Sequence, residues 1–429
     1  MLSKVRLVSR GFCAKQTSRS SILHLRCVQQ QRAGVMTDSY HRDAAVQAAV
    51  FQSAAPVLAS AMNRLCSGLS REAPLLSIAD LGTSGGSNSL HMLKFCVNFL
   101  RDQLSPLAGS SQREIVVYLN DLPDNDWPVL IKTIDSPASI LKTTVINPVY
   151  TYLVPRSFYE PLFPSNSLDF IVSMITLHWI SSSPHCLYPH LSHLEPGVKT
   201  DVKDIWAKQA HGDLTKFLRH RATELKPGGQ LVVSMVAKGA SGVGGVSESP
   251  QIGEWAAPAL DLHTLVDLRC LESMGLLSHK EAARVSIPVY FRTEEEVLAA
   301  ASEADPNLEV RELTTTREVY SFPSAFHLAD FYLSIMLPSI LACLDDPKTP
   351  NGHAPAVMES SIGARASAED NDAQSAHAHP RRERAIHQAL RSSMAAKIRA
   401  PHQLKWEIDY IILSMSKRSD EGHHDVGFF

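Results

Sequence analysis

The residues with the clearest chemical meaning form a glycine- and serine-rich turn that follows an apolar segment. Residues 75–82 (LLSIADLG) predict a buried strand, TSGGSNS follows as a turn, and 89–104 predict a helix. Turn amides and the N-terminus of a helix attract the negative or polar end of a ligand, and glycine allows that ligand to approach the backbone. This order indicates a ligand site at the end of the strand, although a plain strand–helix connection would have the same pattern.

A carboxylate ends the next predicted strand, 114–121, at Asp121. Such a carboxylate can accept hydrogen bonds from both hydroxyls of a ribose. The turn lacks the G-x-G-x-x-G pattern of dinucleotide sites, and Asp121 lies 33 residues after Asn88 rather than the usual ~20. This spacing disfavours NAD and is compatible with S-adenosylmethionine, which has a ribose and an amino-acid end but no pyrophosphate.

Strands that alternate with long helices must position these residues. Helices are predicted at 43–69, at 201–225, from Trp255 to about Leu277 and from Glu294 onward, and further strands at 168–176, 230–237, 317–322 and 406–416. Alternation of this kind argues for a parallel sheet that is covered by helices on both faces. The sequence therefore predicts an α/β fold with a mostly parallel sheet.

Composition restricts the function classes. The 429 residues are 44% hydrophobic and 20% charged, an ordinary globular balance, and the length allows two or three domains or one large domain with additions. The longest uncharged apolar stretch, 331–344, has 14 residues and contains Pro338, whereas a membrane span takes about 20. The net charge of −3 is too small to indicate nucleic acid, and the seven dispersed cysteines include no C-x-x-C pair. We expect no membrane or nucleic-acid partner, no metal and no disulfide framework.

Two segments are expected to lie outside the folded core. Residues 1–36 contain seven Lys or Arg and no Asp or Glu, which is typical of a transit peptide, so we expect residues 1–35 to direct the chain to a mitochondrion or plastid. A start at Met36 would give a form that stays in the cytoplasm, and a solvated basic tail is the simpler alternative. Residues 345–380 contain no Leu, Phe, Tyr or Trp, so we expect a disordered insertion over 345–381.

Six blocks in one order resemble the plant-type SABATH methyltransferases, which use S-adenosylmethionine to methylate carboxyl groups of small acids or, in some members, ring nitrogens of purine alkaloids. The blocks are Ser39-Tyr40 with Gln47, ADLGTSGGSNS (79–89), YLNDLPDNDW (118–127), SFYEPLFPSNSLDFIVSMITLHWIS (157–181), GLLSHKEAARVSIPVYFRTEEEV (275–297) and YIILSMSKR (410–418). Each block alone is a modest signal, and their shared order carries the resemblance.

The resemblance implies a class I methyltransferase fold, Rossmann-like, with a helical cap subdomain that closes over the acceptor. The core would comprise 36–240, 310–335 and 404–418, and the cap 241–309, 324–345 and 382–400. The implied cofactor is S-adenosyl-L-methionine and the implied partner is a small-molecule carboxylic acid. Family members often form dimers, so a homodimer stays open.

The family motifs also imply site residues. The cofactor's methionine portion would contact Tyr40, Asp80, Gly82 and Asn88, its ribose Asp121 and Leu122, and its adenine Ser157 and Phe158. The acceptor carboxylate would be held by Gln47 and Trp179, in a pocket that Ile175 and His178 also line. Taken singly, each residue has a simpler explanation as a surface, core or capping residue.

The implied reaction fits the absence of an obvious catalytic base. A carboxylate is already ionised at neutral pH, so methyl transfer to it requires no proton abstraction. Neutral donors at Gln47 and Trp179 could orient the anion without an ion pair, and in-line placement against the sulfonium methyl is worth about 7–11 kcal/mol at most. A dry pocket would favour a transition state in which opposite charges neutralise each other.

Departures from the family pattern bear on the acceptor. Ile175 stands where salicylate-type members have an aromatic hydroxyl, which favours an aliphatic or plain aromatic acid. Asp43-Ala44 replaces the family's Asn-Ser near the cofactor. Two alternatives therefore stay open: N-methylation of a nitrogen heterocycle, and a cofactor-binding protein without turnover.

Overall fold

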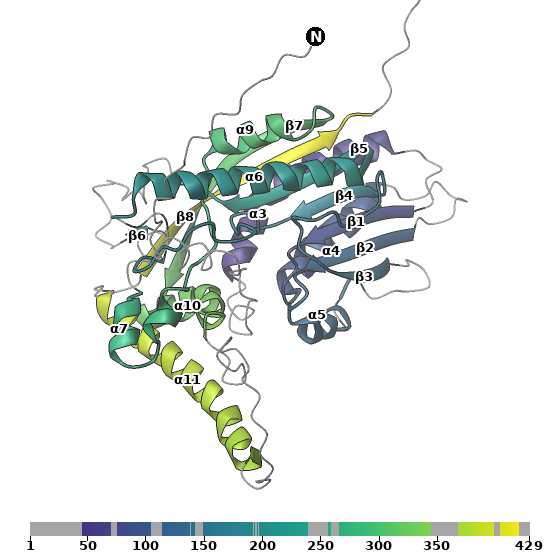
Figure 1. Ribbon diagram of the computed structural model, residues 1–429. Helices are drawn as coiled ribbons and strands as arrows, with labels where there is room; N and C mark the ends of the chain where they lie inside the picture. The colour runs from purple at the N-terminus through teal and green to yellow at the C-terminus, as the bar shows by residue number, and fades with distance from the viewer. Residues whose placement is uncertain are drawn as a thin grey trace, which may run out of the picture.

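The computed structural model describes residues 45–69, 75–103, 114–137, 139–141, 149–191, 193, 195, 197–238, 256–258, 266–344, 368–398 and 404–419 (Figure 1). Within these ranges, side chains are left undescribed at 45–48, 256–258, 368–380 and 404–405. The expected transit peptide at 1–35, Tyr40 and the first part of the expected insertion, 345–367, lie outside the described residues and stay predictions.

The described strands form one eight-stranded sheet in the order β3-β2-β1-β4-β5-β8-β6, with β7 also paired to β8. Their bounds are β1 Leu75–Leu81, β2 Glu114–Asp121, β3 Val149–Pro155, β4 Leu168–Ser173, β5 Leu225–Val236, β6 Ala256–Pro258, β7 Leu308–Phe322 and β8 Leu404–Lys417. Strands β1 to β5 pair in parallel, whereas β8 runs antiparallel to both β5 and β7. The predicted α/β fold with a mostly parallel sheet is confirmed.

Helices cover both faces of this sheet, and in Figure 1 α6 crosses in front of it. Their bounds are α3 Ala45–Gly68, α4 Ser87–Gln103, α5 Trp127–Ile134, α6 Thr200–Glu224 and α9 Glu294–Ala304. In β1, Ile78 packs in the apolar cluster with α3 and α4, and the next residue, Ala79, packs in the cluster with α6 and α9. Because both faces are buried, the central strands are apolar almost without interruption. No helix in the described part of the chain has the length and apolarity to span a membrane.

A helical cap lies beside one end of the sheet (Figure 1) and is built on extensions of β7 and β8. Its helices are α7 Leu268–Ser273, α8 His279–Ala282, α10 Ala325–Leu341 and α11 Ala368–Lys397. The ring of Trp406 in β8 contacts Phe331 and Tyr332 of α10 and Phe322 of β7. Further along β8, Leu413 packs in the cluster under α6. One pair of strands therefore belongs to both the sheet and the cap.

Several elements differ from their predictions because of neighbours that are distant in the chain. Strand β3 was not predicted: it is a sheet edge with an exposed Tyr152. Its residues VYTYLVP favour a strand but do not form the continuous apolar run of a central one. Strand β6 lies inside the predicted helix from Trp255, since three residues there pair with β8. Strand β5 begins at Leu225, before the predicted start at 230. Helix α6 ends at Glu224, where the sequence predicted a terminator, and the pairing of β5 with β4 shifts register between Leu225 and Gln230.

The boundaries of the cap and the insertion also differ. Helix α9 falls within 241–309, which was assigned to the cap, but its residues Val297 and Ala300 pack against α6 over the sheet. Helix α11 begins at Ala368, inside the stretch 345–381 that was predicted to be disordered. Four alanines within 368–378 favour helix there, although these residues offer no large apolar side chain for a core.

Candidate functional site

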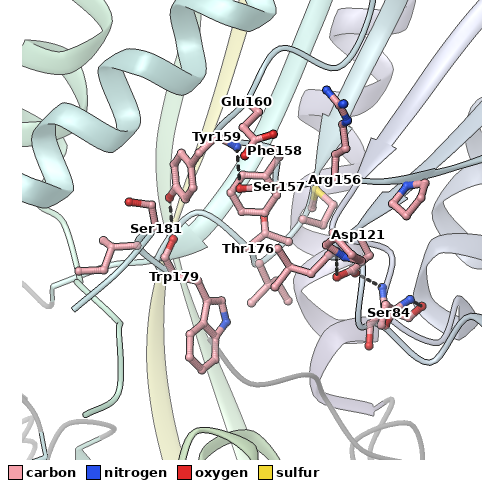
Figure 2. A pocket seen from close by; sticks show the side chains of 18 of the residues that line it. Ser84, Asp121, Arg156, Ser157, Phe158, Tyr159, Glu160, Thr176, Trp179 and Ser181 are labelled. Carbon is pink, nitrogen blue, oxygen red and sulfur yellow. Dashed lines mark hydrogen bonds between the residues drawn. The ribbon is translucent and has the colours of Figure 1, made fainter. Parts of the chain in front are cut away.

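Two adjoining cavities lie at the C-terminal ends of β1, β2 and β4, the edge at which parallel α/β sheets bind ligands. The larger, of about 500 Å³, is lined by the turn after β1, the end of β2, the segment 155–160 and the residues that follow β4 (Figure 2). The smaller, of about 60 Å³, is lined partly by Asp80 and Asn88. Four residues line both cavities, which therefore meet there: Gly82, Ser84, Met174 and Ile175.

Gly82 determines the turn after β1. Its φ is +88°, and a Cβ at this position would lie 2.4 Å from Cγ2 of Thr176. The amides of Gly82 and Thr83 donate to the carbonyl of Asn120 at 2.8 and 3.0 Å. Both the backbone conformation and the close approach of the chain after β4 therefore require glycine, and the turn is held against the end of β2.

Asp121 joins the end of β2 to this turn. Its Oδ2 accepts from the amide of Ser84 at 2.7 Å, and its Oδ1 accepts from the amide of Leu122 at 2.8 Å. Burial raises the pKa of Asp121, and these two amides oppose that rise. Each carboxylate oxygen retains a further lone pair, so the group can also accept from ligand hydroxyls in the cavity.

Asp80 presents a buried carboxylate to the smaller cavity. Its Oδ2 has no hydrogen-bond partner among the described residues. Burial raises the pKa of Asp80 to about 7, a hydrogen bond from Ser89 opposes the rise, and the nearby Asp121 adds to it. Because an unpaired buried carboxylate is costly, this end of the site suits a ligand that brings a cationic group.

The segment 155–160 forms another wall of the larger cavity. Asn120 donates through Nδ2 to the carbonyls of Val154 and Arg156, both at 2.7 Å. The ring of Phe158 packs edge-on against Phe217 of α6, with ring centroids 5.8 Å apart. An aromatic ring beside the hydroxyl of Ser157 suits a flat heterocycle with a polar edge.

Ile175 and Trp179 separate the larger cavity from the apolar cap. Ile175 has a φ of +56°, rare for a β-branched residue, and its amide donates to Oγ of Ser234 at 2.9 Å. The carbonyl of Trp179 accepts from the hydroxyl of Tyr159 at 2.6 Å, and its ring lies on the other side of the backbone (Figure 2). Both side chains pack against the cap cluster, so they contribute apolar surface and one indole N–H group to the cavity.

His178 differs from its prediction. It is absent from the described residues that line either cavity. Its side chain is buried, with ring contacts to Trp179 and Phe291, and its Nδ1 has no described partner. Burial, together with the charge of Arg292, lowers its pKa to about 3, so the imidazole is neutral near pH 7.

The structure brings together most of the residues that the sequence pointed to. The two cavities are lined by Asp80, Gly82, Asn88, Asp121, Leu122, Ser157, Phe158, Ile175 and Trp179. Gln47 lies in the first turn of α3, but its side chain is outside the described residues, as is the whole of Tyr40. Ser84, Asn120 and Thr176 were missed as site residues, although each stands within one of the sequence blocks 79–89, 118–127 and 157–181.

Comparison with known proteins places this geometry among methyltransferases. The profile of a family described as SAM dependent carboxyl methyltransferase matches residues 27–322. Salicylate carboxymethyltransferase of Clarkia breweri is 28% identical over 65% of this chain and 74% of its own length. Gibberellic acid methyltransferase 1 of Arabidopsis thaliana is 30% identical over 66% of this chain and 75% of its own.

Two further comparisons concern an N-methyltransferase and a solved structure. A 3,7-dimethylxanthine N-methyltransferase of Camellia sinensis var. assamica is 29% identical over 60% of this chain and 69% of its own length. The solved structure of a loganic acid methyltransferase with SAH superposes with a TM-score of 0.58 at 18% identity, covering 92% of this chain and 100% of that chain. This last likeness concerns the fold.

Proposed function

Since this chain belongs to the family of SAM-dependent carboxyl methyltransferases, we propose that it methylates the carboxylate of a small hydrophobic acid, giving a methyl ester and S-adenosylhomocysteine. It is a SAM-dependent methyltransferase, and S-adenosylmethionine is its cofactor. The acceptor class rests on one observation: Ile175 and Trp179, which line the cavity and pack against the apolar cap cluster, provide apolar surface and one neutral N–H group.

The two adjoining cavities fit the parts of this cofactor. The residues assigned are Asp121 and Leu122 to the ribose, Ser157 and Phe158 to the adenine, and Asp80, Gly82 and Asn88 to the methionine portion. Tyr40, which lies outside the described residues, is assigned to the methionine portion from the family motif alone. The unpaired Oδ2 of Asp80 suits an ammonium group. When bound, the cofactor supplies an electrophilic methyl group on a sulfonium.

The protein's part in the reaction is to position the acceptor against the cofactor and to remove water from both. The acceptor is already an anion at neutral pH, so no residue needs to remove a proton. Trp179 and Gln47 donate hydrogen bonds that orient its oxygens, and Ile175 keeps water away from the point where the cavities meet. Because opposite charges neutralise each other in the transition state, this dry environment favours it over the separated ions.

A labelled-methyl assay tests the proposal. Purified protein is incubated with methyl-labelled S-adenosylmethionine and a panel of acids that starts with benzoic, cinnamic and medium-chain aliphatic acids. We expect a labelled product that mild alkali cleaves, as it cleaves an ester. Cofactor binding by calorimetry without transfer to any acid would contradict the proposal and favour a protein without turnover.

N-methylation of a nitrogen heterocycle is the second candidate. It is favoured by the relative named 3,7-dimethylxanthine N-methyltransferase, which is as similar to this chain as the relatives named for acids. The same assay distinguishes the two, because an N-methyl product keeps its label in mild alkali.

Replacing Gln47 by alanine is expected to lower the rate of transfer about tenfold or more, since a hydrogen bond to a charged group is lost. The affinity for S-adenosylhomocysteine, measured by calorimetry, should stay close to that of the unmodified protein. Gln52→Ala is the matched control, because Gln52 is exposed on the same helix. Equal rates for the two variants would remove Gln47 from the acceptor site.

Cofactor affinity is expected to fall as the pH is lowered through about 7. Below its raised pKa of about 7, Asp80 is protonated in the free protein and must lose this proton to pair with an ammonium group. The dissociation constant of S-adenosylhomocysteine should therefore rise about tenfold per pH unit below that value. Calorimetry from pH 5.5 to 8 tests this. Asp80→Asn should bind weakly with a flat profile, and a sloping profile in this variant would assign the titration to another group.

A further inference from the structure

The last turn of α6 contains a buried ion pair, and both of its side chains hydrogen-bond to the chain after β3. Nη2 of Arg221 lies 2.8 Å from Oε1 of Glu224, and the two side chains are 0% and 2% exposed. No other ion pair among the described residues has both partners buried to this extent. Desolvating two charges is costly, and a buried pair is often no more stabilising than apolar side chains of the same volume. Stability alone therefore does not explain it.

Arg221 holds the segment at its beginning. Its Nη1 donates to the carbonyl of Phe158 at 2.9 Å, and its Nη2 donates to the carbonyl of Glu160 at 3.1 Å. Its guanidinium also stacks over the ring of Phe217, 5.1 Å from the centroid, and Phe217 in turn supports the ring of Phe158. Backbone and ring of Phe158 are thus fixed through one side chain.

Glu224 holds the segment at its end. Its Oε1 accepts from the amides of Leu162 and Phe163 at 2.7 and 3.2 Å. The pair therefore fixes four backbone groups within six residues, 158–163. The planar guanidinium directs Nη1 to one backbone carbonyl and Nη2 to a second carbonyl and to Oε1 of Glu224. It therefore fixes direction as well as distance, which a single lysine ammonium would not.

The segment held in this way is a wall of the larger cavity. Ser157, Phe158, Tyr159 and Glu160 all line it (Figure 2). Arg221 and Glu224 are absent from the described lining and lie behind the wall. Their effect on a ligand must therefore pass through the segment.

We propose that the Arg221–Glu224 pair positions the cofactor: it sets the place of the wall formed by Ser157 and Phe158, against which the adenine lies. The proposal rests on the adenine assignment made above. It does not depend on the identity of the acceptor. The two residues are positioning residues, since neither reaches the cavity.

The test measures ligand affinity in the full chain carrying Arg221→Lys, which keeps the charge but not the fork. Calorimetry is done with S-adenosylhomocysteine and with 5′-methylthioadenosine, which has the adenine and ribose but no amino-acid end. We expect both dissociation constants to rise by the same factor, about tenfold. Unchanged affinity for both ligands, or a loss confined to S-adenosylhomocysteine, would overturn the proposal.

Asp169→Asn is the matched control. Like Glu224, Asp169 is a buried carboxylate that holds a backbone amide and pairs with a cation. Its Oδ2 accepts from the amide and hydroxyl of Ser77 at 2.8 and 2.7 Å and from Nζ of Lys226 at 2.7 Å. It lies at the start of β4, the end of the strand remote from the cavities. This variant should lower the unfolding temperature without changing either affinity. If Asp169→Asn raised both dissociation constants as much as Arg221→Lys does, the effect of the ion pair on binding would be explained by lower overall stability.

Glu224→Gln covers the case in which Arg221→Lys does not fold. It keeps the size of the side chain and an oxygen that can accept from the amides of Leu162 and Phe163, but it removes the charge that pairs with Arg221. Both ligands should again bind more weakly by one common factor, and unchanged affinity would overturn the proposal. These measurements need no acceptor, so a failure to methylate any acid would contradict the proposed function without touching this inference.

Discussion

Replacing Gly82 by alanine is expected to reduce methyl transfer about a hundredfold or more, the effect of displacing reacting groups by about 1 Å. The new Cβ would lie 2.4 Å from Cγ2 of Thr176. Thr176 cannot easily yield, because its hydroxyl lies 2.5 Å from Oγ of Ser173, which in turn donates to the carbonyl of Leu81 at 2.8 Å. The turn must move instead. Initial rates with labelled S-adenosylmethionine measure the loss.

Substitution of a second glycine distinguishes the steric clash expected at Gly82 from the strain of a positive φ. Gly228 also has a positive φ, +79°, but a Cβ there would meet nothing within 4 Å. Gly228→Ala should therefore lower stability by about 1–2 kcal/mol, the cost of a left-handed alanine, and leave the rate nearly unchanged. Equal loss of rate in the two variants would contradict the importance of the close approach at Gly82.

Replacing Asp121 by alanine is expected to raise the dissociation constant of S-adenosylhomocysteine about a hundredfold. The change removes the acceptor proposed for the ribose and also leaves the amides of Ser84 and Leu122 without their carboxylate. Hydrogen bonds to charged groups contribute about 1.5–3 kcal/mol each, so the loss of two or more accounts for this size. Calorimetry measures the affinity directly.

Two further variants divide this effect. Asp121→Asn keeps one oxygen acceptor and should bind the ligand with intermediate affinity. Asp124→Ala removes a nearby exposed carboxylate whose charge acts on Asp121 and should change the affinity little. If Asp121→Ala bound S-adenosylhomocysteine as tightly as the unmodified protein, the ribose assignment would be wrong.

The central strands of the sheet could be predicted from the sequence because they are buried. Strands β1, β2 and β4 are covered on both faces, so their apolar runs were visible, and the turn and carboxylate at their ends were found with them. Edge strand β3 lacks such an apolar run, because tyrosine and threonine interrupt it, although these residue types favour a strand. Three-residue β6 exists because β8 lies beside it, and no local pattern encodes that neighbour.

The site residues also fall into those that local sequence predicted and those that it did not. Residues that touch a ligand directly stand in recognisable turns, and these were predicted. Residues that hold the turns were missed, because their function depends on distant partners. Asn120 binds carbonyls 34 and 36 residues away, and Arg221 binds one 63 residues away. Ile175 was expected as a pocket residue, but its left-handed backbone could not be foreseen, since isoleucine rarely adopts it.

The strands shared by sheet and cap have a consequence for engineering. The ladder of β7 and β8 runs from Leu308 opposite Lys417 to Phe322 opposite Leu404, crossing from one apolar cluster into the other. A relative's cap therefore cannot be grafted as a separate module, because any junction would cut a continuous hydrogen-bonded ribbon. Altering acceptor choice calls for single substitutions along the wall at Ile175 and Trp179, which leave this ribbon intact.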